Sequence, residues 1–209
     1  MFFERPIEWP SLRRFLLEVH LDLIKIDNSA DKLNFESGLS STEKMILILE
    51  DRRFFRHYGV DVLSVIREAL KAIAFKRHGG ASTIDMQWVR TVTGYRDLTY
   101  RRKLYEMFLS MIIQQRYDKM TIFKSYMQCA YLGHRIKGLE KACEVVFMKR
   151  HTELTVDEAS EIAAMFVYPR PSVRAPRWLL KLERRKNYAK VLYPRHKKRF
   201  DKLPSRKIL

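Results

Sequence analysis

Hydrophobic residues recur every three to four positions along most of this chain, which is the spacing of α-helices with one buried face. Near the N-terminus, Phe15, Leu16, Val19, Leu23 and Ile26 follow this spacing with charged residues between them. We therefore predict an amphipathic N-terminal lead over residues 1–39, with a helix that docks on the core of its own protein and a polar loop after it.

Two capping boxes mark the starts of further helices. Ser40 and Glu43 precede the apolar run 45–49, and Thr155 and Glu158 precede the apolar segment 159–167. The first of these helices delivers Glu50 from a buried segment. Helical spacing also covers 62–75, 101–117 and 121–132, whereas the period-two alternation typical of strands is almost absent. The fold class predicted from these patterns is mainly α.

Composition fits one compact domain, because 209 residues with 46% hydrophobic side chains can bury one substantial core. The net charge of +17 favours a polyanionic partner, namely nucleic acid, an anionic membrane surface or a phosphorylated substrate. Most of this charge is C-terminal, since residues 170–209 hold 15 Lys and Arg against two acids. We expect residues 177–209 to form a basic tail that either grips lipid head groups or is a solvated, poorly ordered end.

Other features of the sequence say little about partners or compartment. Cys129 and Cys143 lack CxxC spacing and are expected to be buried free thiols. No apolar run reaches the ~18 residues needed to span a bilayer, and no signal peptide is visible. His57 is expected to be a structural hydrogen-bonding residue, and no group of side chains has metal-ligand spacing.

Four short motifs carry the candidate chemistry. They are EDRRFFRHYGVD from Glu50, GASTIDMQWVR from Gly80, RRKLYE from Arg101 and SYMQCAYLGHRIKGLEKA from Ser125. Each has an ordinary structural explanation when taken alone. Acids that end helices are usually solvated, Ser and Thr often cap helices, and cations three or four residues before a carboxylate commonly form surface ion pairs.

Together, in this order and at these spacings, the motifs resemble those of the family 51 peptidoglycan glycosyltransferases, which include the transglycosylase domains of class A penicillin-binding proteins. The resemblance covers residues 40–176. It implies a lysozyme-like helical large lobe and a smaller, mobile, membrane-facing lobe at about residues 60–80. It also implies that the chain polymerises lipid II into glycan strands on the outer face of the cytoplasmic membrane. Undecaprenyl pyrophosphate leaves with inversion at the anomeric carbon.

The resemblance assigns roles to individual residues. Glu50 is the expected general base, because an attacking sugar hydroxyl must lose its proton, and Glu106 is the second catalytic acid, in the cleft with Glu50. A pyrophosphate leaving group needs neutralising cations more than a proton donor. The expected substrate-binding residues are Asp51, Ser82, Thr83, Gln87, Arg90, Arg102 and Lys103.

The resemblance also bears on cofactors and partners. No cofactor is required, although Mg²⁺ or Mn²⁺ assists some members of the family. The expected partners are lipid II, the growing glycan chain, a membrane surface contacted peripherally, and penicillin-binding transpeptidases; nucleic acid is not expected. The stretch 62–75 fits membrane contact and core burial equally well, because both use an amphipathic helix.

Several positions depart from the family pattern and motivate other hypotheses. The departures are Asp85, Met86 and Thr91 in the second motif, Gln114 eight residues after Glu106, Lys124 and Gln128 in the fourth motif, and Met148 in place of a glycine. One alternative is a catalytically weak accessory protein that binds lipid II or glycan. A second alternative, a basic nucleic-acid-binding protein, is motivated only by the charge of the tail. A third, a lysozyme-like hydrolase, is disfavoured because phosphate-binding cations have no purpose in the cleavage of a glycan.

Overall fold

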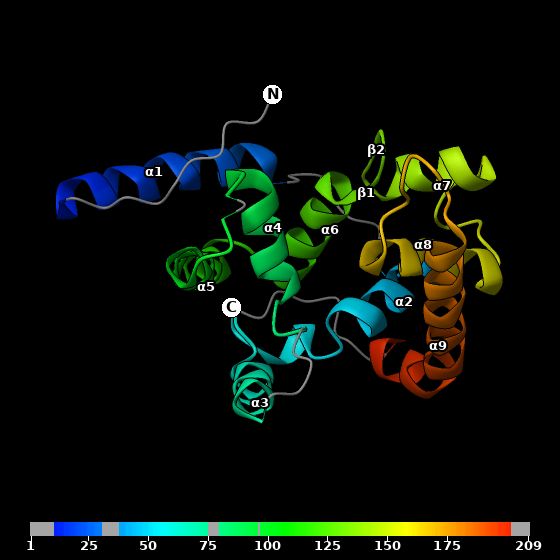
Figure 1. The fold of residues 1–209 in the computed structure, drawn as a ribbon. Helices are drawn as coiled ribbons and strands as arrows, with labels where there is room; N and C mark the ends of the chain where they lie inside the picture. The colour runs from blue at the N-terminus through cyan, green and yellow to red at the C-terminus, as the bar shows by residue number, and fades with distance from the viewer. Residues whose placement is uncertain (1–10, 31–37, 75–79, 96, 202–209) are drawn as a thin grey trace. The chain divides into compact units, whose positions relative to one another are not determined.

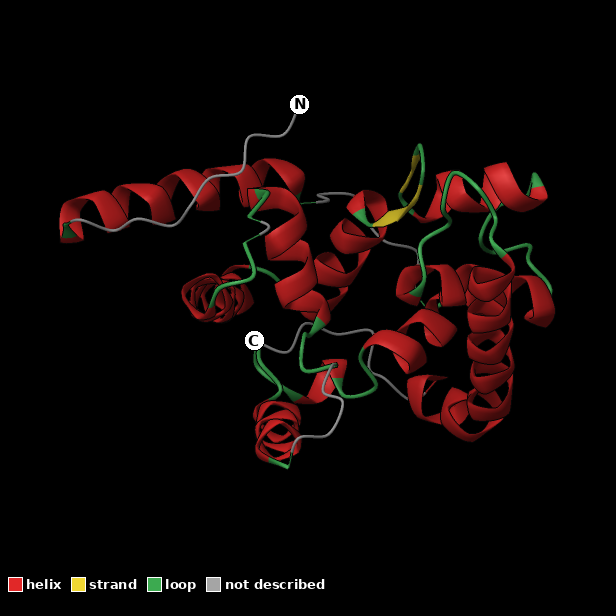
Figure 2. Ribbon diagram, viewed as in Figure 1, coloured by secondary structure: helices red, strands yellow, loops and turns green. Residues whose placement is uncertain are grey.

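The structure is a computed structural model that describes residues 11–30, 38–74, 80–95 and 97–201. The described chain is almost entirely helical, with one short two-stranded hairpin (Figure 2). This confirms the mainly α fold class expected from the sequence. The chain forms two compact units: unit 1 combines residues 1–32 with 53–126, and unit 2 combines residues 33–52 with 127–209.

Unit 1 is built from helices that pack around aromatic side chains. Its elements are α1 (Leu12–Ser29), the 3-10 helix η1 (Phe54–Arg56), α3 (Val62–Ile73), α4 (Ile84–Thr93), α5 (Tyr100–Arg116) and α6 (Lys119–Cys129), whose last turn passes into unit 2. Trp88, Tyr105 and Phe123 are among its largest fully buried side chains. Helix α1 packs on α4 and buries Val19, Leu23 and Ile26 of the predicted apolar face, whereas Leu16 is exposed.

Unit 2 is centred on three mutually packed helices. Its elements are α2 (Ser41–Glu50), β1 (Tyr131–Gly133), β2 (Ile136–Lys137), α7 (Leu139–Phe147), α8 (Val156–Val167) and α9 (Pro176–Asp201). Helices α2, α8 and α9 contact one another (Figure 1). Residues 45–49 of α2 are all buried, because this helix packs against both α8 and α9. Both predicted capping boxes are present and start α2 and α8.

The segment treated as a basic tail differs from expectation. Residues 176–201 form a continuous helix, α9, that belongs to unit 2. Leu182, Ala189, Leu192 and Tyr193 are buried in it, and the Tyr193 hydroxyl lies 2.9 Å from Ser41 Oγ. These apolar positions are spaced for one helix face, but they are diluted by so many cations that the stretch resembles a solvated end. Residues 202–209 lie outside the described residues.

The helix expected over 121–132 ends earlier than its apolar pattern suggests. Helix α6 stops at Cys129, and the antiparallel hairpin β1–β2 follows. Two glycines shape this turn, since a Cβ on Gly133 would lie 2.3 Å from the Arg170 carbonyl oxygen and one on Gly138 would lie 2.6 Å from that of Gln128. Such close backbone approach needs the absence of a side chain, a requirement that periodicity does not express.

Helix α3 presents its apolar side to solvent. Leu63, Ile66 and Leu70 are exposed to 57%, 50% and 62%, whereas Ser64 and Glu68 are buried. This arrangement inverts the usual amphipathic helix, whose apolar stripe faces the core. Of the two interpretations of residues 62–75, the structure therefore supports an exposed apolar face and not burial in the core. Phe75 lies outside the described residues. Within the described part of the chain, no helix has the length and apolar character required to cross a bilayer.

Candidate functional site

Seven of the nine predicted site residues lie in unit 1, on α4, on α5 and just before α4. Ser82, Thr83, Gln87 and Arg90 come from the second motif, and Arg102, Lys103 and Glu106 come from the third. Glu50 and Asp51 belong to unit 2, where Glu50 is the last residue of α2 and Asp51 is its C-cap. The cleft expected to hold both Glu50 and Glu106 stays a prediction.

Glu106 is the centre of the unit 1 cluster. Its side chain is 1% exposed, and neither carboxylate oxygen accepts a hydrogen bond. Arg102 Nη1 lies 3.5 Å from one oxygen and Lys103 Nζ lies 4.0 Å from the other. The ordinary explanation of a surface ion pair therefore does not hold, because this carboxylate is enclosed and only loosely paired.

Burial and the neighbouring charges have opposite effects on the pKa of Glu106. Burial raises the pKa of Glu106, while Arg90, Arg102 and Lys103 act in the opposite direction without cancelling the rise. Burial also lowers the pKa of Lys103, against the attraction of Glu106 and with the help of two neighbouring arginines. Three cations around one carboxylate leave an excess of positive charge in a half-buried place. Such a cluster is suited to bind an anion, whose oxygens would accept hydrogen bonds from the cationic side chains.

Lys103 is oriented by a second contact. Its Nζ donates a hydrogen bond to Ser82 Oγ at 2.7 Å, which joins the second motif to the third. Because the Lys103 side chain keeps 30% of its surface exposed, the ammonium group remains accessible. Gln87 Oε1 accepts a hydrogen bond from Tyr126, a residue of the fourth motif, at 2.6 Å. The polar groups of three motifs are thus brought together in unit 1.

Thr83 has a clear structural role. Its side chain accepts from the backbone N–H of Met86 and so caps α4, while its hydroxyl donates to the Gly59 carbonyl at 2.6 Å. Thr83 is 2% exposed, so its polar atom is committed to holding the first and second motifs together. The capping explanation of the sequence analysis is confirmed, and a direct contact with substrate stays a prediction.

Glu50 is positioned by helix packing in unit 2. The preceding carbonyl, that of Leu49, accepts a hydrogen bond from Arg185 Nη2 of α9 at 2.9 Å. A cation at the carboxyl end of a helix also interacts favourably with the helix dipole. Helix α9 therefore fixes the end of the helix that carries the expected base, a role that the description of this segment as a tail had missed.

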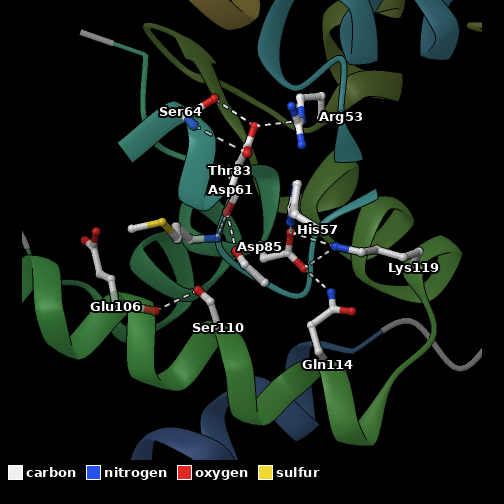
Figure 3. A network of polar contacts seen from close by, with 12 residues as sticks. Arg53, His57, Asp61, Ser64, Thr83, Asp85, Glu106, Ser110, Gln114 and Lys119 are labelled. Carbon is white, nitrogen blue, oxygen red and sulfur yellow. Dashed lines mark hydrogen bonds and ion pairs between the residues drawn. The ribbon is translucent and has the colours of Figure 1, made fainter. Parts of the chain in front are cut away.

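A buried polar cluster next to the site was not expected from the sequence. Asp85 is fully buried in the first turn of α4 and accepts hydrogen bonds from Gln114 and from Lys119, the latter at 3.1 and 3.2 Å. His57 Nδ1 lies 4.0 Å from the same carboxylate. Figure 3 shows these groups converging from η1, α4, α5 and α6. His57 is 4% exposed, which supports a structural role for it.

Two departures from the family pattern meet in this cluster. They are Asp85 and Gln114, which lie 29 residues apart in the sequence. In the structure they are direct hydrogen-bond partners. The residues at these two positions are therefore coupled in this chain, and their effect on activity stays to be measured.

We expect this contact to appear as an interaction energy in a double-mutant cycle. Asp85→Thr leaves Lys119 without its buried carboxylate, and Gln114→Glu sets a second carboxylate against Asp85, so each single change should destabilise the protein by about 1–3 kcal/mol. The double variant should regain about 1–2 kcal/mol of that loss in urea unfolding. Asp85→Thr combined with a change at the exposed neighbour, Gln115→Glu, is the matched control. Equal losses in both double variants would show that the pair is not coupled.

The comparisons with known proteins agree with this geometry. A protein from Cupriavidus necator, provisionally named a transglycosylase, is 38% identical over 57% of this chain and 52% of its own length. Penicillin-binding protein 1A of Escherichia coli is 37% identical over 58% of this chain and 14% of its own length, and penicillin-binding protein 2D of Bacillus subtilis is 34% identical over 58% and 18%. The chain thus spans about half of the first relative and a smaller share of the penicillin-binding proteins. The profile of the transglycosylase family matches residues 22–192, and the chain belongs to that family.

Proposed function

We propose that this chain is a peptidoglycan glycosyltransferase that polymerises lipid II. The observation that carries the proposal is the cluster of Arg90, Arg102 and Lys103 around a buried Glu106 whose oxygens accept no hydrogen bond. Reaction at the anomeric carbon of a lipid-linked sugar releases a pyrophosphate, whose charge increases as the glycosidic bond breaks. Fixed cations that need no reorganisation stabilise that charge most in a half-buried site.

The proposed reaction begins with a proton transfer. Glu50 removes the proton from the attacking sugar 4-hydroxyl, the oxygen forms a bond to the anomeric carbon on the face opposite the pyrophosphate, and the configuration inverts. The electron pair of the broken bond leaves on undecaprenyl pyrophosphate, which the cationic cluster holds. Ser82 and Glu106 keep the Lys103 ammonium in place, on the evidence of the 2.7 Å and 4.0 Å separations.

A cofactor has no role in this proposal. One carboxylate surrounded by three cations is a poor donor set for Mg²⁺ or Mn²⁺, which favour several oxygen ligands. The neutralising charge therefore comes from side chains, and no step is routed through a metal. The expectation that no cofactor is required stays a prediction, which polymerisation assays with and without a chelator would test.

The proposed substrate carries a long lipid tail, so the enzyme must work at a membrane. The outward apolar row of α3, which contains Leu63, Ile66 and Leu70, supports this location. Arg67 and Lys71 border the same surface, and cations beside an apolar row suit an anionic interface. We infer that α3 lies on the membrane, at the outer face of the cytoplasmic membrane where lipid II is polymerised. Penicillin-binding transpeptidases that cross-link the glycan are the proposed partners.

Polymerisation of purified lipid II in detergent is the deciding experiment. The wild type should produce glycan strands, and Glu50→Gln should reduce the rate by roughly 10²–10⁴-fold, because the attacking hydroxyl loses its base. Glu183→Gln removes an exposed carboxylate from α9 in the same unit and should leave the rate unchanged. A catalytically competent family member serves as the positive control.

Two results would contradict the proposed reaction or the proposed base. If the wild type bound lipid II without forming polymer under conditions in which the control enzyme works, the chain would be an accessory protein that holds the precursor. If Glu50→Gln polymerised as fast as the wild type, the assignment of the base would be wrong even though the activity was present.

A further inference from the structure

Helix α9 carries far more cations than its packing uses. Ten Lys and Arg and two acids lie between Pro176 and Asp201. Some of these cations hold the helix in unit 2: Lys186 lies 2.7 Å from Asp157 and 3.3 Å from Glu161, and Lys190 lies 2.8 Å from Asp157. The inward cations of α9 are thus matched by carboxylates of α8.

The remaining cations include a row on the opposite side. Arg177, Lys181, Arg184 and Arg195 are all exposed, and their spacing places them on one face of the helix; we call these four residues the outer row. Among the described residues of unit 2, no carboxylate forms an ion pair with any member of the outer row. Neighbouring cations three or four residues apart repel each other, so the row does nothing for the stability of the helix.

Apolar side chains accompany the outer row. Leu180, Tyr188 and Val191 are exposed to 61%, 41% and 59% on the same side of α9. Cations that alternate with exposed aliphatic and aromatic groups are typical of a helix lying at the interface of a bilayer, where cations reach the head groups and apolar groups sink below them. A nucleic acid surface offers no comparable place for the aliphatic side chains.

We propose that the outer row of α9 binds the anionic head groups of a lipid bilayer, which gives unit 2 a membrane contact of its own. This contact differs in kind from that of α3 in unit 1. The α3 surface is mainly apolar and should bind neutral lipid as well, whereas the outer row acts through charge and should require anionic lipid. The inference does not depend on catalysis, because it rests on charge and exposure alone.

Sedimentation with lipid vesicles tests the inference on the full chain. Vesicles of phosphatidylcholine alone are compared with vesicles that also contain phosphatidylglycerol, at low and high salt. The variant Arg177→Gln/Lys181→Gln/Arg184→Gln/Arg195→Gln should lose roughly tenfold or more of the affinity for the anionic vesicles. It should bind neutral vesicles like the wild type and polymerise lipid II normally in detergent.

A matched variant separates the outer row from net charge. Arg135, Lys137, Lys141 and Arg150 are exposed cations of unit 2 outside α9, and changing all four to Gln removes the same charge. This variant should keep most of the binding to anionic vesicles. Equal losses in both variants would overturn the proposal, as would unchanged vesicle binding by the outer-row variant. Loss of binding to duplex DNA with unchanged vesicle binding would assign the row to nucleic acid instead.

Discussion

Gly59→Ala should destabilise unit 1 by roughly 3 kcal/mol or more, through strain and a backbone clash that add together. Gly59 has a φ of +77°, and a Cβ there would lie 2.4 Å from the carbonyl oxygen of Ser110 in α5. Its own carbonyl accepts the hydrogen bond from Thr83. The first motif, the second motif and the helix that carries the third motif meet at this glycine, so polymerisation should fall with stability.

Gly94→Ala provides the matched control for this prediction. Gly94 has nearly the same φ, +79°, but a Cβ on it meets no atom within 4 Å. Its substitution should therefore cost only the left-handed backbone strain, about 1 kcal/mol. Urea unfolding followed by circular dichroism measures both changes. Similar midpoints for the two variants would show that the close approach to Ser110 is unimportant. If Gly59→Ala yields no folded protein while Gly94→Ala does, the clash with Ser110 is confirmed as the larger of the two effects.

Glu106→Gln should separate activity from stability. The rate of polymerisation should fall by about 10²-fold or more, because the carboxylate that organises the cations around the pyrophosphate is lost. Thermal and urea stability at neutral pH should be unchanged or higher. The raised pKa of Glu106 means that the fold favours the protonated carboxyl, since burial outweighs the three cations. A neutral side chain of the same shape removes that unfavourable ionisation.

The pH dependence of stability checks the sign of this effect. A carboxyl whose folded pKa lies above its unfolded value lowers stability as pH rises, from the ordinary glutamate range near about 4.3 up to the folded pKa. Below that range the wild type and Glu106→Gln should be equally stable, and above it the variant should be the more stable. A variant that is less stable at neutral pH would show that the cations outweigh burial.

Glu144→Gln is the control for the same experiment. Lys141 and Glu144 have the spacing of Lys103 and Glu106, but both side chains are more than half exposed, at 52% and 67%. Water screens such a pair, so its removal should change stability by less than about 1 kcal/mol and leave activity intact. The contrast isolates burial as the cause of the effect at Glu106.

Local features of this fold were predictable from the sequence because they depend on neighbouring residues. Ser40 with Glu43, and Thr155 with Glu158, start α2 and α8 as their capping boxes indicated. Helical periodicity over 101–117 placed the candidate residues of the third motif on α5. For the second motif the sequence indicated only a Ser or Thr helix cap, which Thr83 provides at the start of α4. The membership of the transglycosylase family followed from the order of the motifs.

Features that depend on tertiary packing could not be predicted from such patterns. The period of α3 identified an apolar face but could not say that solvent lies beside it, since a core-facing helix has the same moment. The burial of Glu106 and the contact between Asp85 and Gln114 depend on how α4, α5 and α6 pack. The short hairpin after α6 depends on backbone approaches at Gly133 and Gly138. The buried face of α9 was not recognised in the sequence, because many Lys and Arg residues separate its apolar positions.

The inverted amphipathicity of α3 bears on how easily this helix can be displaced. Displacing α8 would expose a continuous apolar surface that includes Ile162, Met165 and Phe166, at a large hydrophobic cost. Helix α3 instead turns Ser64 and Glu68 inward, and these make hydrogen bonds and ion pairs worth about 1 kcal/mol each. Tilting α3 therefore sacrifices little buried apolar area. On the proposed membrane, α3 is therefore expected to adjust its angle while the rest of unit 1 keeps its packing.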